Sequence, residues 1–119
     1  MKILHTADWH LGTFRSPVKD GVNLRTEDTK RCLDELIRVA NEEKPDYSIV
    51  SGDIFHVGRL WSDRCCEEII TAIHYIRELA AVSKQVVVMR GTPNHDGSGQ
   101  FNVLSEMFAD VPNVHVVIT

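Results

Sequence analysis

Short apolar segments alternate along the 119-residue chain with longer segments whose apolar residues recur every three or four positions. The short segments, which we expect to be strands, are 2–7, 46–51, 85–89 and 114–118. The longer ones, which we expect to be helices, are 27–43, 63–81 and 100–109. Strands that alternate with helices favour right-handed crossovers and a mainly parallel sheet. The sequence therefore predicts a layered α/β domain with the sheet flanked by helices.

Individual residues refine this prediction. Thr26 and Ser62 are candidate N-caps of the first two helices, and the polar stretch before Thr26 indicates a long loop. The unbroken apolar segment Gln85–Met89 is typical of a strand buried on both faces. His5 lies within the first strand and is expected to be a hydrogen-bonded core histidine. The helix residues expected to face the core are Cys32, Leu33, Leu36, Ile37, Ala40, Cys66, Ile69, Ile70, Ile73, Ile76, Leu79, Phe101, Leu104 and Phe108.

The composition excludes several classes of protein. With 43% hydrophobic and 25% charged residues, the chain is neither collagen-like, disordered nor a disulfide scaffold, and its three cysteines have no C-x-x-C spacing. No apolar run approaches the roughly 20 residues of a membrane span, and no secretion signal is recognisable, so we expect a cytoplasmic protein without membrane contacts. The net charge of -4 argues against coating nucleic acid by bulk charge. It does not exclude a phosphodiesterase, because bound cations change the local charge.

Polar residues suited to chemistry follow three of the expected strands. They are Asp8-Trp9-His10, then Gly52-Asp53-Ile54-Phe55-His56, then Gly91-Thr92-Pro93-Asn94-His95-Asp96. In an open α/β sheet the carboxyl ends of the strands form one edge, where ligands bind. We therefore expect these three segments, remote in sequence, to meet at one site.

The residue types in these segments indicate a centre with two divalent metal ions. Asp8 and His10 are two positions apart, so in an extended chain they point the same way and can bind one ion. Asp53, next to Gly52, has enough lone pairs to bridge two ions, and Asn94 offers an amide oxygen to the second. Mixed oxygen and imidazole ligands suit Mn²⁺, Fe or Zn²⁺ better than Ca²⁺. Two such ions about 3.5–4 Å apart can activate water for hydrolysis of a phosphate ester.

Two further histidines complete the expected site. His95 follows Asn94 and, with an unperturbed pKa of about 6.5, is suited to protonate the leaving oxygen or stabilise transition-state charge. His56, three residues after Asp53, is expected to orient the phosphate. Asp96 either orients His95 or caps the turn that follows it, and the sequence leaves both interpretations open.

The motifs D-x-H, G-D and then G-N-H, in this order along the chain, are typical of the calcineurin-like metallophosphoesterase superfamily, which the chain resembles. The longer strings at 6–12 (T-A-D-W-H-L-G), 52–56 (G-D-I-F-H) and 94–96 (N-H-D) look like the SbcD-type family of DNA exonuclease subunits. The resemblance covers essentially all of residues 1–119 and implies the N-terminal part of a calcineurin-like metallophosphoesterase (nuclease) domain. It assigns metal binding to Asp8, His10, Asp53 and Asn94, leaving-group assistance to His95 and phosphate placement to His56.

The resemblance also implies partners and a reaction. It points to Mn²⁺-dependent exonuclease or endonuclease action on DNA in double-strand-break repair, with an SbcC-like ATPase subunit bound through regions beyond Thr119. A homodimer through the second helix is a further hypothesis. Two departures stand out: Thr92-Pro93 opens the usual G-N-H-D string, and the family's later G-H-x-H string has no counterpart in the chain.

These departures keep two alternatives open. One is another metallophosphoesterase, namely a protein phosphatase or a nucleotide phosphodiesterase. Asp96, where protein phosphatases have Glu, and the pair Phe55-His56 both favour the nuclease. The other alternative is a non-catalytic, truncated fragment that folds and binds metal, because two ions need more donors than the motifs supply.

Overall fold

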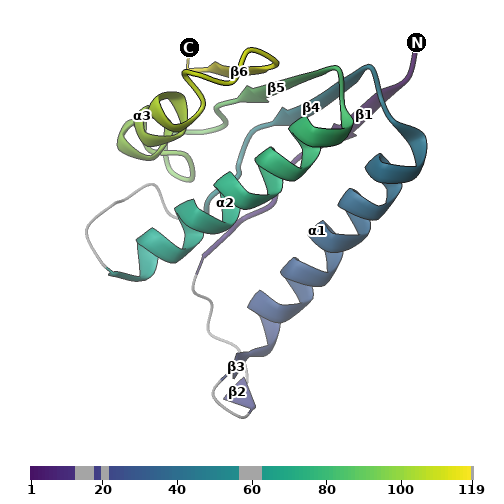
Figure 1. Cartoon of the computed structure of the whole chain (residues 1–119). Coiled ribbons are helices and arrows are strands. Elements are labelled where there is room, and N and C mark those ends of the chain that lie inside the picture. The colour runs from purple at the N-terminus through teal and green to yellow at the C-terminus, as the bar shows by residue number, and fades with distance from the viewer. Residues whose placement is uncertain (13–17, 20–21, 57–62, 119) are drawn as a thin grey trace.

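The computed structural model describes residues 1–12, 18–19, 22–56 and 63–118, which form a parallel sheet covered by helices (Figure 1). The sheet contains β1 (Ile3–Thr6), β4 (Tyr47–Ser51), β5 (Gln85–Met89) and β6 (Val114–Val117), in the spatial order β1-β4-β5-β6. The helices are α1 (Leu24–Glu43), α2 (Asp63–Val82) and α3 (Ser98–Met107). All neighbouring strands of this sheet pair in parallel. The predicted layered α/β fold is confirmed.

The helices pack on one face of this sheet. Each crossover moves to the next strand in the same direction, and because crossovers are right-handed the helices accumulate on one side. Val50 and Val88, which are register partners on that side, are fully buried. On the opposite face Ile3 is 59% exposed and Met89 is 42% exposed. The prediction that Gln85–Met89 is buried on both faces is therefore wrong for the described structure, in which burial alternates along β5.

Several local predictions also differ from the structure. Helix α1 begins at Leu24, so Thr26 lies inside its first turn instead of capping it. The expected loop contains a short antiparallel pair, β2 (Val18–Lys19) with β3 (Val22–Asn23). His5 is exposed, with its Nε2 2.6 Å from Ser51 Oγ, because it points to the open face of the sheet. Ser62 lies outside the described residues.

The helices form the core with their apolar faces, with two exceptions to the expected pattern. Cys32 is exposed on α1, and Ile70 on α2 is 65% exposed. The side chain of Cys66 lies outside the described part of the chain. No helix among the described residues has the length and apolar character needed to cross a membrane. Of the residues expected to face the core, those found buried or partly buried are Leu33, Leu36, Ile37, Ala40, Ile69, Ile73, Ile76, Leu79, Phe101, Leu104 and, directly after α3, Phe108.

Candidate metal centre

The loops after β1 and β4 are joined by backbone hydrogen bonds beyond the ends of their strands. The N–H of Asp8 donates to the carbonyl of Gly52 at 3.1 Å, and the N–H of His10 donates to the carbonyl of Asp53 at 3.0 Å. These bonds continue the parallel pairing of the two strands into the loops. They fix the first two motifs side by side at the carboxyl edge of the sheet.

In the loop after β1, buried apolar residues alternate with polar residues that face outward. Trp9 and Leu11 are each only 6% exposed, and the Trp9 indole N–H donates to Thr6 Oγ1 at 2.8 Å. Trp9 also packs edge-on against Tyr75 of α2, with ring centroids 6.5 Å apart. With these apolar neighbours anchored in the core, Asp8 is left exposed and His10 half-buried.

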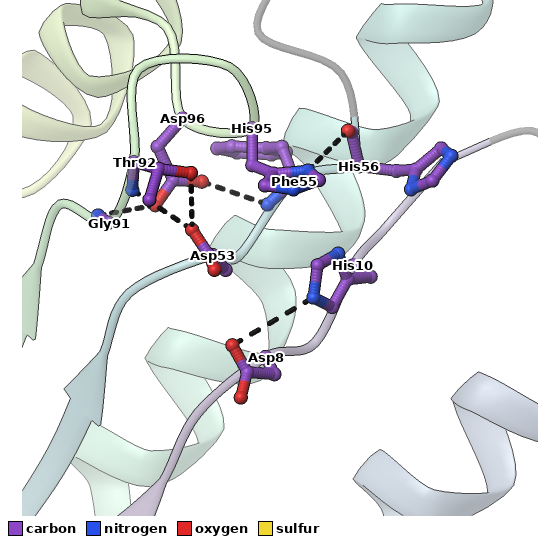
Figure 2. Close-up of polar contacts among 9 residues, drawn as sticks. All are labelled: Asp8, His10, Asp53, Phe55, His56, Gly91, Thr92, His95 and Asp96. Carbon is purple, nitrogen blue, oxygen red and sulfur yellow. Dashed lines mark hydrogen bonds and ion pairs between the residues drawn. The ribbon is translucent and has the colours of Figure 1, made fainter.

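The third loop is attached through the fully buried side chain of Asp96 (Figure 2). Its Oδ1 accepts the N–H of Phe55 at 3.0 Å, and its Oδ2 accepts the N–H of Gly91 at 2.7 Å. Arg90 Nε donates to the Asp96 carbonyl at 2.8 Å. The structure thus gives Asp96 a role that neither sequence interpretation contained, because its carboxylate links the loop after β4 to the loop after β5.

Thr92 holds the Asp53 side chain. Its N–H and its hydroxyl both donate to Asp53 Oδ1, at 3.0 and 3.2 Å (Figure 2). The backbone bond from Thr92 is the largest influence that lowers the pKa of Asp53 below its ordinary value; burial opposes it, and His95 and His10 assist it. Asp53 therefore favours the charged form that binds cations. Asn94 is exposed on the same loop, and its role as a ligand stays a prediction.

Asp8, His10 and Asp53 bring candidate ligand atoms within 4.8 Å of one another. His10 Nε2 lies 3.8 Å from Asp8 Oδ1, so small side-chain movements would let both bind one ion. Two carboxylates and an imidazole are a donor set that fits a divalent cation such as Mn²⁺, Fe²⁺ or Zn²⁺. All three residues have left-handed backbone conformations, with φ of 56°, 49° and 50° respectively.

Three histidines form a second group at the same edge. The rings of His10 and His95 have centroids 4.8 Å apart, and the His56 ring lies 6.1 Å from His10 and 6.0 Å from His95. His95 Nδ1 lies 2.7 Å from the carbonyl oxygen of His56. Burial lowers the pKa of His56, and the neighbouring His10 and His95 lower it further, so the neutral imidazole is favoured.

Gly52 is required by the close approach of two loops. Its φ is 101°, and a Cβ at this position would lie 2.7 Å from the Cα of Gly91. We expect Gly52→Ala to lower the free energy of unfolding by about 2 kcal/mol or more, because both backbone strain and overpacking oppose it. Chemical denaturation measures the change. Gly99→Ala in α3 is the matched control and should be neutral or stabilising; equal stability of the two variants would contradict the prediction.

A groove of about 300 Å³ opens beside His10, between the N-terminal halves of α1 and α2. Lys30, Glu67 and Glu68 are among the residues that line it. Burial is the main cause that raises the pKa of Glu68 to about 6, and Glu67 adds to the effect. The two carboxylates make this groove a poor site for a phosphodiester.

A comparison with protein families identifies the family of the chain. The family described as calcineurin-like phosphoesterase matches residues 1–118. The chain belongs to the calcineurin-like phosphoesterase family. In this family context the edge that carries Asp8, His10 and Asp53 is the natural candidate for its metal centre.

Two relatives of the chain are named as subunits of a bacterial nuclease. The SbcD subunit of nuclease SbcCD from Staphylococcus epidermidis is 30% identical over 108 residues, which are 91% of this chain and 26% of the relative. The protein of the same name from Staphylococcus saprophyticus is 31% identical over 108 residues, with the same two coverages. The chain therefore spans about a quarter of the length of these curated relatives.

Proposed function

We propose that this chain provides part of a metal-dependent active site that hydrolyses phosphodiester bonds of DNA. The observation that carries the proposal is the convergence of Asp8, His10 and Asp53, whose ligand atoms lie within 4.8 Å of one another. The similarity to subunits of a nuclease supports DNA as the substrate over a phosphoprotein or a cyclic nucleotide. Mn²⁺ is the proposed metal, bound by these three residues and by Asn94.

Each residue has a proposed part in the reaction. Bound divalent ions would polarise the phosphate and lower the pKa of the attacking water. Asp53, held by Thr92, would keep its carboxylate fixed between the first and third loops. His95 donates its Nδ1 hydrogen to the His56 carbonyl, so its Nε2 is the nitrogen available to the leaving oxygen. His56 would orient the phosphate.

Residues 1–119 are proposed to be the N-terminal part of a larger calcineurin-like domain. Their match to about a quarter of each relative supports this, and so does the small number of donors that the motifs supply. The naming of both relatives as subunits of SbcCD supports a partner of SbcC type. Double-strand-break repair, a cytoplasmic location and a homodimer through α2 stay predictions.

Substrate comparison tests the proposed function. Hydrolysis of single-stranded DNA, a cyclic nucleotide and a phosphopeptide is measured with Mn²⁺ and with a chelator, for this chain and for a version extended at its C-terminal end. We expect DNA cleavage in the extended version with Mn²⁺ and none with the chelator. Faster hydrolysis of the phosphopeptide or the cyclic nucleotide would favour the alternative phosphoesterases, and Mn²⁺-independent cleavage would refute the metal mechanism.

We expect His95→Gln to separate binding from catalysis. The substitution removes a proton donor but no proposed Mn²⁺ ligand, so in the extended version Mn²⁺ affinity should change by less than about threefold while turnover on DNA falls roughly 100-fold or more. Titration calorimetry and single-turnover cleavage measure the two quantities. His74→Gln, an exposed position on α2, is the control and should match the unsubstituted protein. Unchanged turnover in His95→Gln would remove His95 from the proposed mechanism.

A further inference from the structure

The histidine group at the carboxyl edge has the composition of a metal site of its own. His10, His56 and His95 each offer a ring nitrogen, and these three atoms lie within 4.8 Å of one another. All three side chains are half-buried, and they come from three different loops. Imidazole sets of this kind suit Zn²⁺, which often takes three histidines and one water.

One hydrogen bond orients the His95 ring for metal binding. A backbone carbonyl can only accept, so the 2.7 Å contact with the His56 carbonyl makes Nδ1 of His95 the donor. In the neutral form of this ring the lone pair is then on Nε2. Histidines that bind metals commonly donate their other N–H to a carbonyl in this way, which fixes both tautomer and ring orientation.

Binding of one Zn²⁺ requires the three ring nitrogens to move only slightly closer together. Two nitrogens bound tetrahedrally to one Zn²⁺ at about 2.1 Å are roughly 3.4 Å apart. A pair at the 4.8 Å limit must therefore approach by about 1.4 Å, which rotation of the side chains can supply. The Asp53 carboxylate adds negative charge nearby, since it interacts electrostatically with both His10 and His95.

We propose that His10, His56 and His95 form a Zn²⁺ site that is distinct from the carboxylate-containing Mn²⁺ site and competes with it. Neutral His10 has a single ring lone pair, so it binds one ion at a time. Zn²⁺ at the three histidines would therefore withdraw His10 from the Mn²⁺ site. It would also occupy His56 and His95, so Zn²⁺ would act as an inhibitor. The Zn²⁺ site itself does not depend on the proposed hydrolytic function.

The experiment measures binding of Zn²⁺ and Mn²⁺ separately in the 119-residue chain. Zn²⁺ affinity is obtained by competition with a chromophoric chelator, and Mn²⁺ affinity by electron paramagnetic resonance. The variants are His56→Gln, His95→Gln and Asp53→Asn, with His115→Gln as the matched control on the exposed surface of β6. Circular dichroism and the metal-free melting temperature verify that each variant is folded.

If the two sites are distinct, the histidine variants and the aspartate variant should have opposite effects on the Zn²⁺ and Mn²⁺ affinities. His56→Gln and His95→Gln should weaken Zn²⁺ binding at least tenfold and Mn²⁺ binding by less than about threefold. Asp53→Asn should lose Mn²⁺ binding and lose less than tenfold in Zn²⁺ affinity, and His115→Gln should change neither. In the unsubstituted chain, stoichiometric Zn²⁺ should displace Mn²⁺.

Either of two outcomes would overturn the proposal. In the first, both histidine variants bind Zn²⁺ as tightly as the unsubstituted chain. In the second, Asp53→Asn loses as much Zn²⁺ affinity as they do, which would place Zn²⁺ among the carboxylates. Failure of the proposed function is distinguishable, because it would show as unchanged Mn²⁺ binding in Asp53→Asn whatever the Zn²⁺ result.

Discussion

Mn²⁺ affinity should fall by about 100-fold or more when Asp53 is replaced by asparagine, and Mn²⁺-dependent DNA cleavage should fall with it. Even loss of a residue that only orients a ligand costs 10- to 100-fold, and Asp53 is proposed to bind the ion directly. Asparagine keeps the shape of the side chain, and it tolerates the left-handed backbone at φ 50°. Its amide oxygen can still accept from Thr92. The fold should therefore survive while the charge is lost.

Titration calorimetry of the folded variant with Mn²⁺ measures this effect. Asp110→Asn makes the same chemical change on an exposed residue near the end of α3 and should leave Mn²⁺ affinity unchanged. If Asp53→Asn and Asp110→Asn bound Mn²⁺ equally well, the metal centre at this edge of the sheet would be refuted.

Asp96→Ala should cause the largest loss of stability. The substitution leaves the buried N–H of Phe55 and the partly buried N–H of Gly91 without their acceptors, and it opens a cavity. Each unsatisfied group costs about 1–3 kcal/mol, so we expect a total near 3 kcal/mol. For a domain of this size that corresponds to a fall in melting temperature of roughly 10–20 °C. Thermal denaturation followed by circular dichroism measures it.

Two variants bracket the Asp96 prediction. Asp96→Asn retains one acceptor and should lose less stability than Asp96→Ala. Asp110→Ala removes an exposed carboxylate and should change the melting temperature by no more than a few degrees. A melting temperature of Asp96→Ala equal to that of Asp110→Ala would show that the link between the loops contributes nothing to stability.

The sequence predicts the layers of the fold because periodicity reports local burial. Apolar spacing located α1, α2 and α3 within a few residues and β5 at its observed bounds. It could not predict which faces other segments cover, since that depends on topology. Hence Ile70 and Cys32 continue an apolar stripe but are exposed, and Met89 ends an apolar strand on an uncovered face.

The candidate site was predictable in part for a similar reason. Asp8, His10 and Asp53 follow strands, and parallel strands bring their carboxyl ends together. The bonds made by Thr92 and Asp96 were not predictable, because both cross from one loop to another. Thr92 belongs to the segment that departs from the family string, and only the three-dimensional structure reveals its contact with Asp53.

The left-handed backbone at Asp8, His10 and Asp53 lowers the stability of the fold at the candidate site. Glycine adopts this conformation without steric cost, whereas aspartate and histidine adopt it less readily than glycine, although more often than most other residues. A laboratory selection for thermal tolerance alone should therefore enrich glycine at these three positions. The proposed metal ligands would then be lost. Because substitutions that stabilise the backbone here would remove the proposed metal ligands, thermostabilising this protein without a parallel screen for metal uptake would select against the proposed metal centre.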